Sequence, residues 1–156
     1  MPILRKLREY LDEHKIKYHV LTHSTAYTAQ EVAQTQHVPG KMMAKVVMVK
    51  KENGAPMMLV LPASHKVDFT RLREVLGARA ELEQEREFRD LFAGCEIGAE
   101  PPFGNLFNLD TVVDTALAQD KEIVFNAGSH WQTVQMRYDD YARLVRPRVA
   151  KFAQHL

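Results

Sequence analysis

The amino-acid sequence predicts an α/β (α+β-like) fold, in which a mixed parallel and antiparallel β-sheet is surrounded by helices. Segments with helical periodicity and segments with strand character are interleaved along the chain, which is typical of this class. The two most apolar runs, residues 44–50 and 57–61, are separated by Asn53-Gly54. Because this pair favours a tight reversal, the two runs are expected to form an antiparallel hairpin. Their near-continuous apolar character indicates a sheet covered on both faces.

The N-terminal part of the chain is predicted to contain a helix, a short strand and a second helix. In the first helix, at about residues 2–14, isoleucine and leucine recur at helical spacing with charges opposite them. A strand is expected at residues 18–21. The second helix, at about residues 29–37, is indicated by Thr28 and Glu31, which have the spacing of a capping box.

The rest of the chain alternates helices and strands around a loop rich in glycine and proline. Asp68 can cap a helix that ends at Gly77, since aspartate satisfies free N–H groups and glycine accepts a left-handed backbone. The remaining expected elements are a helix at 85–92, the loop at 94–108, strands at 112–113, 123–125 and 133–136, and a helix at about 138–145.

Length and composition fit one domain that spans residues 1–156, with 46% hydrophobic and 26% charged residues. The net charge of +1 excludes a strongly basic coat for nucleic acid but allows a local patch. Cys95 is the only cysteine, so no disulfide can form within the chain. No stretch reaches the roughly 18 apolar residues of a membrane span, so a cytoplasmic protein is expected.

Several common catalytic motifs are absent from the sequence. It contains no GxxxxGK[ST], GxGxxG or HExxH pattern, so nucleotide hydrolysis, dinucleotide chemistry and zinc proteolysis have no support. His14, His19 and His23 lack the companion cysteines and acids of a metal site, so no metal or cofactor is expected. Cys95 is interpreted as a small buried residue rather than a nucleophile.

Three features are candidates for a site, and each has two interpretations. Lys45 opens an apolar strand; it either extends its ammonium to water or holds a phosphate or an ester carbonyl. The stiff loop at residues 98–104 either connects two elements or offers free N–H groups to an oxyanion. Residues 127–130 either form a hairpin turn with an exposed histidine or bring His130 into a pocket shared with Lys45.

Taken together, these motifs resemble the YbaK/EbsC family of aminoacyl-tRNA deacylases, which includes the editing domain inserted in bacterial prolyl-tRNA synthetases. The resemblance extends from about His23 to Leu144. The matching motifs are His23-Ser-Thr-Ala-Tyr-Thr-Ala-Gln-Glu-Val-Ala33, Ala44-Lys45, Val60-Leu-Pro-Ala63, Val67-Asp68 with Leu76-Gly77, Gly98-Ala-Glu-Pro-Pro102-Phe-Gly104, Val113-Asp114 and Phe125-Asn-Ala-Gly128.

The resemblance implies hydrolysis of the ester that joins a wrong, small amino acid to the 3′ end of a tRNA, such as alanine on tRNA(Pro). Lys45 occupies the position of the family's strand lysine, and Gly98 that of the glycine whose backbone N–H contacts the aminoacyl carbonyl. His130 matches a histidine found in some members. In the family, water attacks with help from the vicinal ribose hydroxyl, and the resemblance implies the same here, without a metal, a cofactor or a side-chain nucleophile. A synthetase or an elongation factor is an expected further partner.

The amino-acid pocket must be small enough to exclude the correct amino acid, as in double-sieve editing. Val46 stands where alanyl-specific free-standing members tend to have a polar residue. The substrate-binding residues expected from position and resemblance are Tyr27, Met42, Met43, Val46, Pro102 and Gly128. The competing interpretations are a non-catalytic module that binds tRNA or a synthetase, and a hydrolase of another activated ester.

Overall fold

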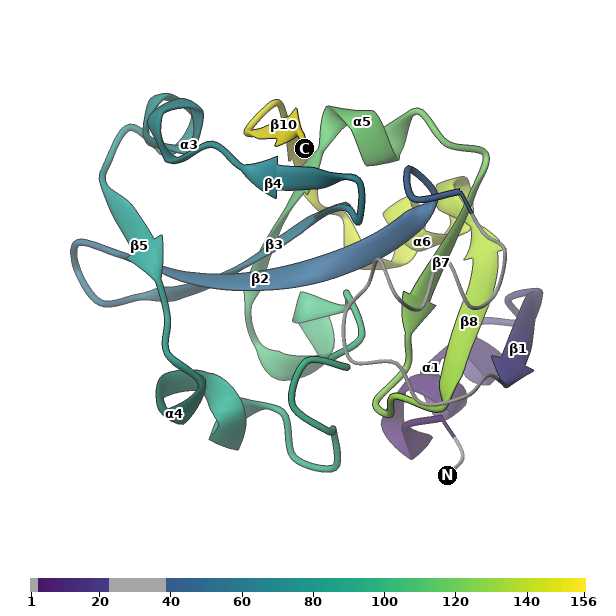
Figure 1. Ribbon diagram of the computed structural model, residues 1–156. Coiled ribbons are helices and arrows are strands. Elements are labelled where there is room, and N and C mark those ends of the chain that lie inside the picture. The colour runs from purple at the N-terminus through teal and green to yellow at the C-terminus, as the bar shows by residue number, and fades with distance from the viewer. Residues whose placement is uncertain (1–2, 23–38) are drawn as a thin grey trace.

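The computed structural model describes residues 3–22 and 39–156, and its centre is a mixed β-sheet with helices on both sides (Figure 1). The strands of this sheet follow the order β1-β8-β7-β2-β3-β6-β9, and β5 pairs with a further part of β2. Their bounds are β1 Tyr18–Thr22, β2 Met43–Lys51, β3 Pro56–Pro62, β5 Ala80–Leu82, β6 Asp110–Asp114, β7 Glu122–Asn126, β8 Gln132–Arg137 and β9 Arg148–Ala150. A separate pair joins β4 (His65–Val67) to β10 (Ala153–His155).

The pairing confirms a mixed sheet. The pairs β2–β7, β3–β6 and β6–β9 are parallel, whereas β2–β3, β7–β8, β1–β8 and β2–β5 are antiparallel. The predicted hairpin is present, with Val46 opposite Val60 and Val49 opposite Met57. Its turn uses Gly54 at a φ of 83°, the left-handed region that glycine accepts at low cost.

Helices and short helical turns cover the two faces of the sheet. They are α1 Arg5–Glu13, α3 Phe69–Leu76, α4 Glu85–Phe88, α5 Thr115–Ala118, α6 Tyr138–Val145 and the 3₁₀ turns η1 Arg89–Leu91 and η2 Gly104–Phe107. None of the helices in the described part of the chain is long and apolar enough to span a membrane.

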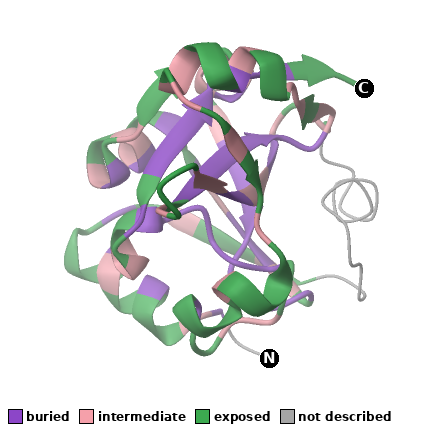
Figure 2. Ribbon diagram, turned by 90° about the vertical axis from the view of Figure 1, so that its left-hand side faces the viewer, coloured by how far each residue is buried: buried purple, intermediate pink, exposed green. Residues whose placement is uncertain are grey.

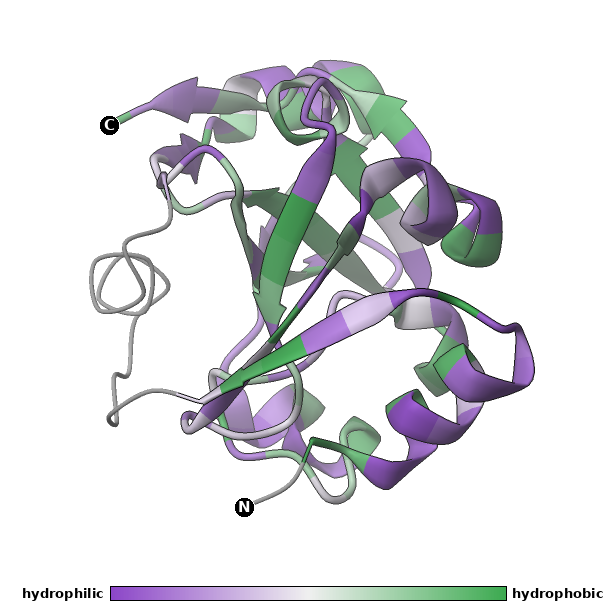
Figure 3. Cartoon of the chain, turned by 90° about the vertical axis from the view of Figure 1, so that its right-hand side faces the viewer, coloured by the Kyte–Doolittle hydropathy of each residue, from purple (hydrophilic) through white to green (hydrophobic). Residues whose placement is uncertain are grey.

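Two hydrophobic cores lie on opposite faces of the sheet, as the apolar strands predicted. Along β2 the side chains alternate: Ala44 and Met48 belong to the first core, which α1 and α6 cover, and Val49 belongs to the second, which contains Leu72 of α3. The central strands are therefore buried (Figure 2) and mostly hydrophobic (Figure 3), while the outer helices are largely exposed.

Helix α1 begins three residues later than predicted. Leu4 has an extended backbone, and its N–H donates to the carbonyl of Ala127 at 2.7 Å, which ties the N-terminal segment to the turn after β7. The prediction of one helix at 85–92 is also wrong in length, because the chain forms the short helix α4 and then the 3₁₀ turn η1. The helix predicted at 29–37, with its capping box, lies outside the described residues.

The caps predicted for α3 are confirmed. The carboxylate of Asp68 accepts from the N–H groups of Thr70 and Arg71, and Gly77 adopts a φ of 70° after the last turn. Four strands of three residues, β4, β5, β9 and β10, were not predicted, since such short segments carry too little periodicity.

Asp114 ties β6 to the C-terminal segment, and its loss is expected to destabilise the fold. It is 2% exposed; one carboxylate oxygen accepts from Ala116 at the start of α5, and the other accepts from the N–H groups of Phe152 and Ala153. Asp114→Ala should lower the free energy of unfolding by about 3 kcal/mol, because these donors lose their partners. Urea denaturation measures this loss. Asp114→Asn retains one acceptor oxygen and should cost less; equal losses would contradict the assignment.

Candidate active site

The site predicted from sequence lies where two parallel strands separate. β2 and β7 pair at two positions, Met43 with Val124 and Ala44 with Phe125. The next residues of β2 that pair on this side, from Val49 onward, do so with β5 instead. Figure 1 shows β7 and β2 diverging beyond their short contact. The two strands thus separate at the carboxyl end of β7 and after the first two residues of β2, which places Lys45 and Asn126 at the point of divergence.

Lys45 is the first residue of β2 beyond this contact. It is half-buried, and burial lowers the pKa of its ammonium group. By strand alternation it shares a face with Val47 and Val49 of the second core. Within the described ranges, the side chain of Lys45 forms no ion pair and no hydrogen bond with another residue. A partly desolvated ammonium without a carboxylate partner is suited to an anionic ligand.

His65, at the start of β4, is a neighbour of Lys45 that the sequence did not indicate. Burial lowers the pKa of His65, and the positive charges of His155 and Lys45 lower it further. Its Nδ1 lies 2.9 Å from the hydroxyl of Ser64. The residues that follow β3 therefore contribute a polar group to the face that carries Lys45.

Asn126, the last residue of β7, is a second neighbour that only the structure identifies. Because Ala44 pairs with Phe125, the residues that follow them, Lys45 and Asn126, lie on the same face of the sheet. Asn126 is 7% exposed, and its side-chain oxygen accepts no hydrogen bond from any described residue. A buried acceptor without a donor is costly, so Asn126 Oδ1 is a candidate contact for a donor group of a substrate.

The loop at Gly98 and the turn at His130 pack against each other. The N–H of Gly128 donates to the carbonyl of Ala99 at 2.8 Å, and the carbonyl of Gly128 accepts from the N–H of Glu96 at 2.8 Å. His130 Nε2 lies 2.7 Å from the carbonyl of Ile97; because a carbonyl only accepts, this nitrogen carries the proton. His130 is 4% exposed, so the interpretation of an exposed turn histidine is wrong.

Gly98 itself is exposed and has a φ of 85°, a conformation that glycine adopts without strain. Its N–H donates to Glu100 Oε1 at 3.2 Å. Burial raises the pKa of Glu100, while hydrogen bonds from the backbone and the charge of His130 act in the opposite direction. The amide that the family resemblance assigns to the aminoacyl carbonyl is therefore held by the Glu100 carboxylate, which a substrate would have to replace.

Pro102 and Gly128 hold the loop and the turn in place. The carbonyl of Pro102 accepts a hydrogen bond of 2.6 Å from the hydroxyl of Tyr141, a fully buried residue of α6. Burial raises the pKa of Tyr141 well above 10, so the phenol remains a donor. A Cβ on Gly128, at a φ of 103°, would lie 2.9 Å from Leu4 Cβ.

The remaining predicted pocket residues are spread over several places. Met43 is fully buried on the face of Lys45. Val46 is half-buried and packs at the edge of the first core, on the opposite face. Met42 precedes β2 and lines a cavity of about 670 Å³ together with Glu122 and Arg137, apart from the loop of Gly98. Tyr27 lies outside the described residues. Their roles in substrate binding stay predictions.

Within the part of the chain that the structure describes, Cys95 is not activated as a nucleophile and the acidic and histidine side chains form no metal-binding group. Burial raises the pKa of the Cys95 thiol to about 12, so it is protonated at neutral pH and a poor nucleophile. Among residues 3–22 and 39–156, no group of three or more histidine, cysteine or acidic side chains is placed to hold a metal ion.

Solved structures share this fold. The crystal structure of the hypothetical protein APE2540 superimposes with a TM-score of 0.86 at 20% identity, covering 96% of this chain and 100% of that chain. The crystal structure of a proposed trans-editing enzyme for prolyl-tRNA synthetase gives a TM-score of 0.81 at 19% identity, with 96% of each chain covered. These likenesses define the class by fold: a small α/β domain built on one mixed sheet.

The family follows from the sequence itself. The family model described as the aminoacyl-tRNA editing domain matches residues 23–144. The Multifunctional Ser/Thr-tRNA deacylase ProXp-y of Escherichia coli (strain K12) is 29% identical over 153 residues, which cover 95% of this chain and 91% of that protein. The chain belongs to the aminoacyl-tRNA editing domain family, so the predicted resemblance is confirmed. It is an aminoacyl-tRNA deacylase, a hydrolytic enzyme that acts on misacylated tRNA.

Proposed function

We propose that residues 1–156 act as one free-standing editing domain that removes a small amino acid from misacylated tRNA, with seryl and threonyl esters preferred over alanine on tRNA(Pro). The observation that carries this preference is the buried oxygen of Asn126, which has no donor among the described residues and lies on the face of Lys45. A site built to accept a hydrogen bond from a substrate hydroxyl discriminates against the analogue that lacks it.

Two further observations support this substrate class. Val46 is apolar where alanyl-specific relatives tend to have a polar residue, so this chain departs from their pattern at this position. The relative ProXp-y, which matches nearly the whole chain, is named as a Ser/Thr-tRNA deacylase.

The proposed reaction relies on position and on electrostatic stabilisation. An aminoacyl ester is already activated, so a bound water can attack its carbonyl carbon when the ester is held in place. The ammonium of Lys45 anchors the terminal phosphate or the reacting ester, and the N–H of Gly98 receives the developing negative charge once Glu100 is replaced. The ester C–O bond then breaks, the ribose oxygen takes up a proton with help from its vicinal hydroxyl, and the free amino acid leaves.

In this scheme His130 is a positioning residue. Its ring is fixed by the carbonyl of Ile97, and its backbone N–H lies 3.4 Å from Glu96 Oε1. Both contacts hold the strand turn against the segment that presents Gly98. The side chain thus sets the geometry of the loop, because its Nε2 donates to the carbonyl of Ile97.

The test is deacylation of a panel of Ser-, Thr-, Ala- and Cys-tRNA(Pro) by the wild type and by Asn126→Leu. The wild type should release serine and threonine faster than alanine. The variant should lower the rates for serine and threonine about tenfold and leave alanine little changed, because one substrate hydrogen bond is lost. The ratio of serine to alanine release is the readout, since partial unfolding lowers both rates together. A wild type that prefers alanine would refute the proposed preference.

A second variant tests whether Val46, which lies on the face of β2 opposite Lys45, contributes to the amino-acid pocket. Val46→Ala removes two methyl groups at the edge of the first core and should change the order of rates across the same panel in favour of larger side chains. Val46→Ile, which adds a methylene, should act in the opposite direction. An unchanged order in both variants would exclude Val46 from the pocket wall.

We also propose that the enzyme acts on tRNA delivered by a synthetase or an elongation factor. With a net charge of +1 the chain has little long-range attraction for RNA.

A further inference from the structure

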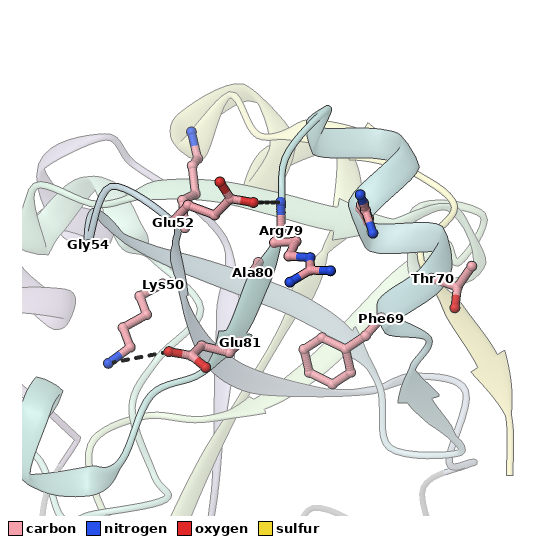
Figure 4. Close-up of a pocket in the computed structure, with 10 residues that line it drawn as sticks. Lys50, Glu52, Gly54, Phe69, Thr70, Arg79, Ala80 and Glu81 are labelled. Carbon is pink, nitrogen blue, oxygen red and sulfur yellow. Dashed lines mark hydrogen bonds and ion pairs between the residues drawn. The ribbon is translucent and has the colours of Figure 1, made fainter.

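A second cavity, of about 730 Å³, lies at the far end of β2 from Lys45 (Figure 4). The β2–β3 hairpin, β5 and the first turns of α3 enclose it. Lys51 at its rim is six residues beyond Lys45, a separation of about 20 Å at about 3.3 Å per residue of strand. Strand alternation places Lys51 on the same face of the sheet as Lys45, the face on which Leu72 of α3 packs.

The cavity has cations that no carboxylate neutralises within the described residues. Arg73 and Arg79 are exposed, and neither guanidinium is in an ion pair or a hydrogen bond with another described side chain. The two acids that line the cavity make other contacts: Glu81 lies 3.7 Å from the ammonium of Lys50, and Glu52 accepts from the backbone N–H of Arg79 at 3.2 Å. They leave the basic residues of the lining in excess. This excess of positive charge is local, since the whole chain carries only +1.

An aromatic ring lies beside these cations. Phe69, the first residue of α3, is 39% exposed although it is large and apolar. Figure 4 shows its ring and the guanidinium group of Arg79 directed into the same space between α3 and β5. An exposed aromatic platform next to arginines is the combination that stacks a nucleobase and holds its phosphate.

We propose that this cavity binds a nucleotide of the tRNA substrate, with its base on Phe69 and its phosphate on Arg73 and Arg79. The inference deepens the proposed function and rests on it. With the aminoacyl end at Lys45, a tRNA that runs alongside β2 brings its backbone to the cavity about 20 Å away, roughly the width of an RNA helix. The cavity recognises a nucleobase together with its phosphate, and a free mononucleotide carries the same two groups.

The proposal is tested with the double variant Arg73→Gln/Arg79→Gln and with Phe69→Ala, using Arg8→Gln as the matched control on the exposed surface of α1. Binding of full-length, uncharged tRNA is measured by fluorescence anisotropy over a range of salt. The double variant should weaken binding and reduce the slope of log K against log salt by about 2, one for each phosphate-neutralising arginine. Phe69→Ala should weaken binding about tenfold through lost stacking. Arg8→Gln should change neither.

Deacylation kinetics separate this site from the catalytic one. The double variant should raise KM for full-length aminoacyl-tRNA and leave kcat unchanged. Hydrolysis of a 3′-aminoacyl adenosine, which is too short to reach the cavity, should be unaffected. Unchanged binding and KM in the double variant, or equal loss on both substrates, would overturn the proposal.

A free nucleotide, in place of a nucleotide of tRNA, is the alternative ligand that carries a base and a phosphate. If AMP shifts the NMR amide signals of residues 69–73 and 79–81 while the double variant binds tRNA as the wild type does, the cavity serves a mononucleotide and the RNA contact is refuted. If the wild type hydrolyses no aminoacyl-tRNA, the proposed function fails, whereas the anisotropy measurement still decides whether the cavity binds RNA.

Discussion

Lys45→Ala is expected to lower kcat/KM for deacylation at least about 100-fold, the size of effect seen when one charge-stabilising group is removed from an active site. Lys45 stands where β2 leaves β7, beside Asn126, and none of the described residues neutralises it. Its charge is therefore available to the terminal phosphate or the ester. The measurement is single-turnover release of the amino acid from the preferred aminoacyl-tRNA of the panel.

The same lysine should determine the alkaline limb of the pH profile. Burial lowers the pKa of Lys45 from its ordinary value of 10.5, so the ammonium form, which is the active one, is lost at a lower pH than for an exposed lysine. Activity should be retained below this lowered pKa and fall as the pH rises through it, after subtraction of spontaneous hydrolysis. Lys45→Arg, which stays protonated, should lose this limb while retaining part of the activity.

The melting temperature of Lys45 variants shows whether a loss of activity comes from the missing ammonium group or from partial unfolding. Because burial disfavours the charged side chain in the folded protein, Lys45→Met should leave the melting temperature unchanged or raise it. A deacylase activity that survives Lys45→Ala, or a melting temperature that falls in Lys45→Met, would contradict the assigned role.

Gly128→Ala is expected to lower the free energy of unfolding by about 2–5 kcal/mol, through backbone strain and a close contact that act together. A residue other than glycine at a φ of 103° is strained by about 1–2 kcal/mol. The added Cβ would also lie 2.9 Å from Leu4 Cβ, and such overpacking costs about 1–3 kcal/mol more. The melting temperature should fall by about 2–4 °C for each kcal/mol.

Gly54→Ala is the matched control for this prediction. Gly54 has a φ of 83°, but a Cβ there would meet nothing within 4 Å, so this variant isolates the backbone strain from the contact with Leu4. Gly128→Ala should be the more destabilising of the two and should also reduce deacylation, because the turn it distorts holds Ala99 and, through it, Gly98. Equal losses of unfolding free energy in the two variants would show that the close contact with Leu4 does not contribute to the destabilisation.

The sequence predicted several residues of the site, but it did not predict how these residues are arranged in space. Lys45, Gly98 and His130 stand in motifs that a short sequence can reveal. Asn126 lies within one of these motifs, but it is singled out only by its burial without a donor, which depends on strands β2 and β7 being neighbours. The contact of Glu100 with Gly98 is local in sequence, yet it depends on a left-handed backbone that the sequence of the loop only permits.

The sequence by itself determined the elements whose signals are local. Asn53-Gly54 specified the hairpin, Asp68 and Gly77 specified the ends of α3, and the apolar runs specified strands covered on both faces. The tertiary structure alone decided the order of the strands, the short strands at the sheet edges, the late start of α1 and the burial of His130. These features depend on contacts between residues far apart in the chain, such as Leu4 with Ala127, and such pairings leave no periodic trace in the sequence.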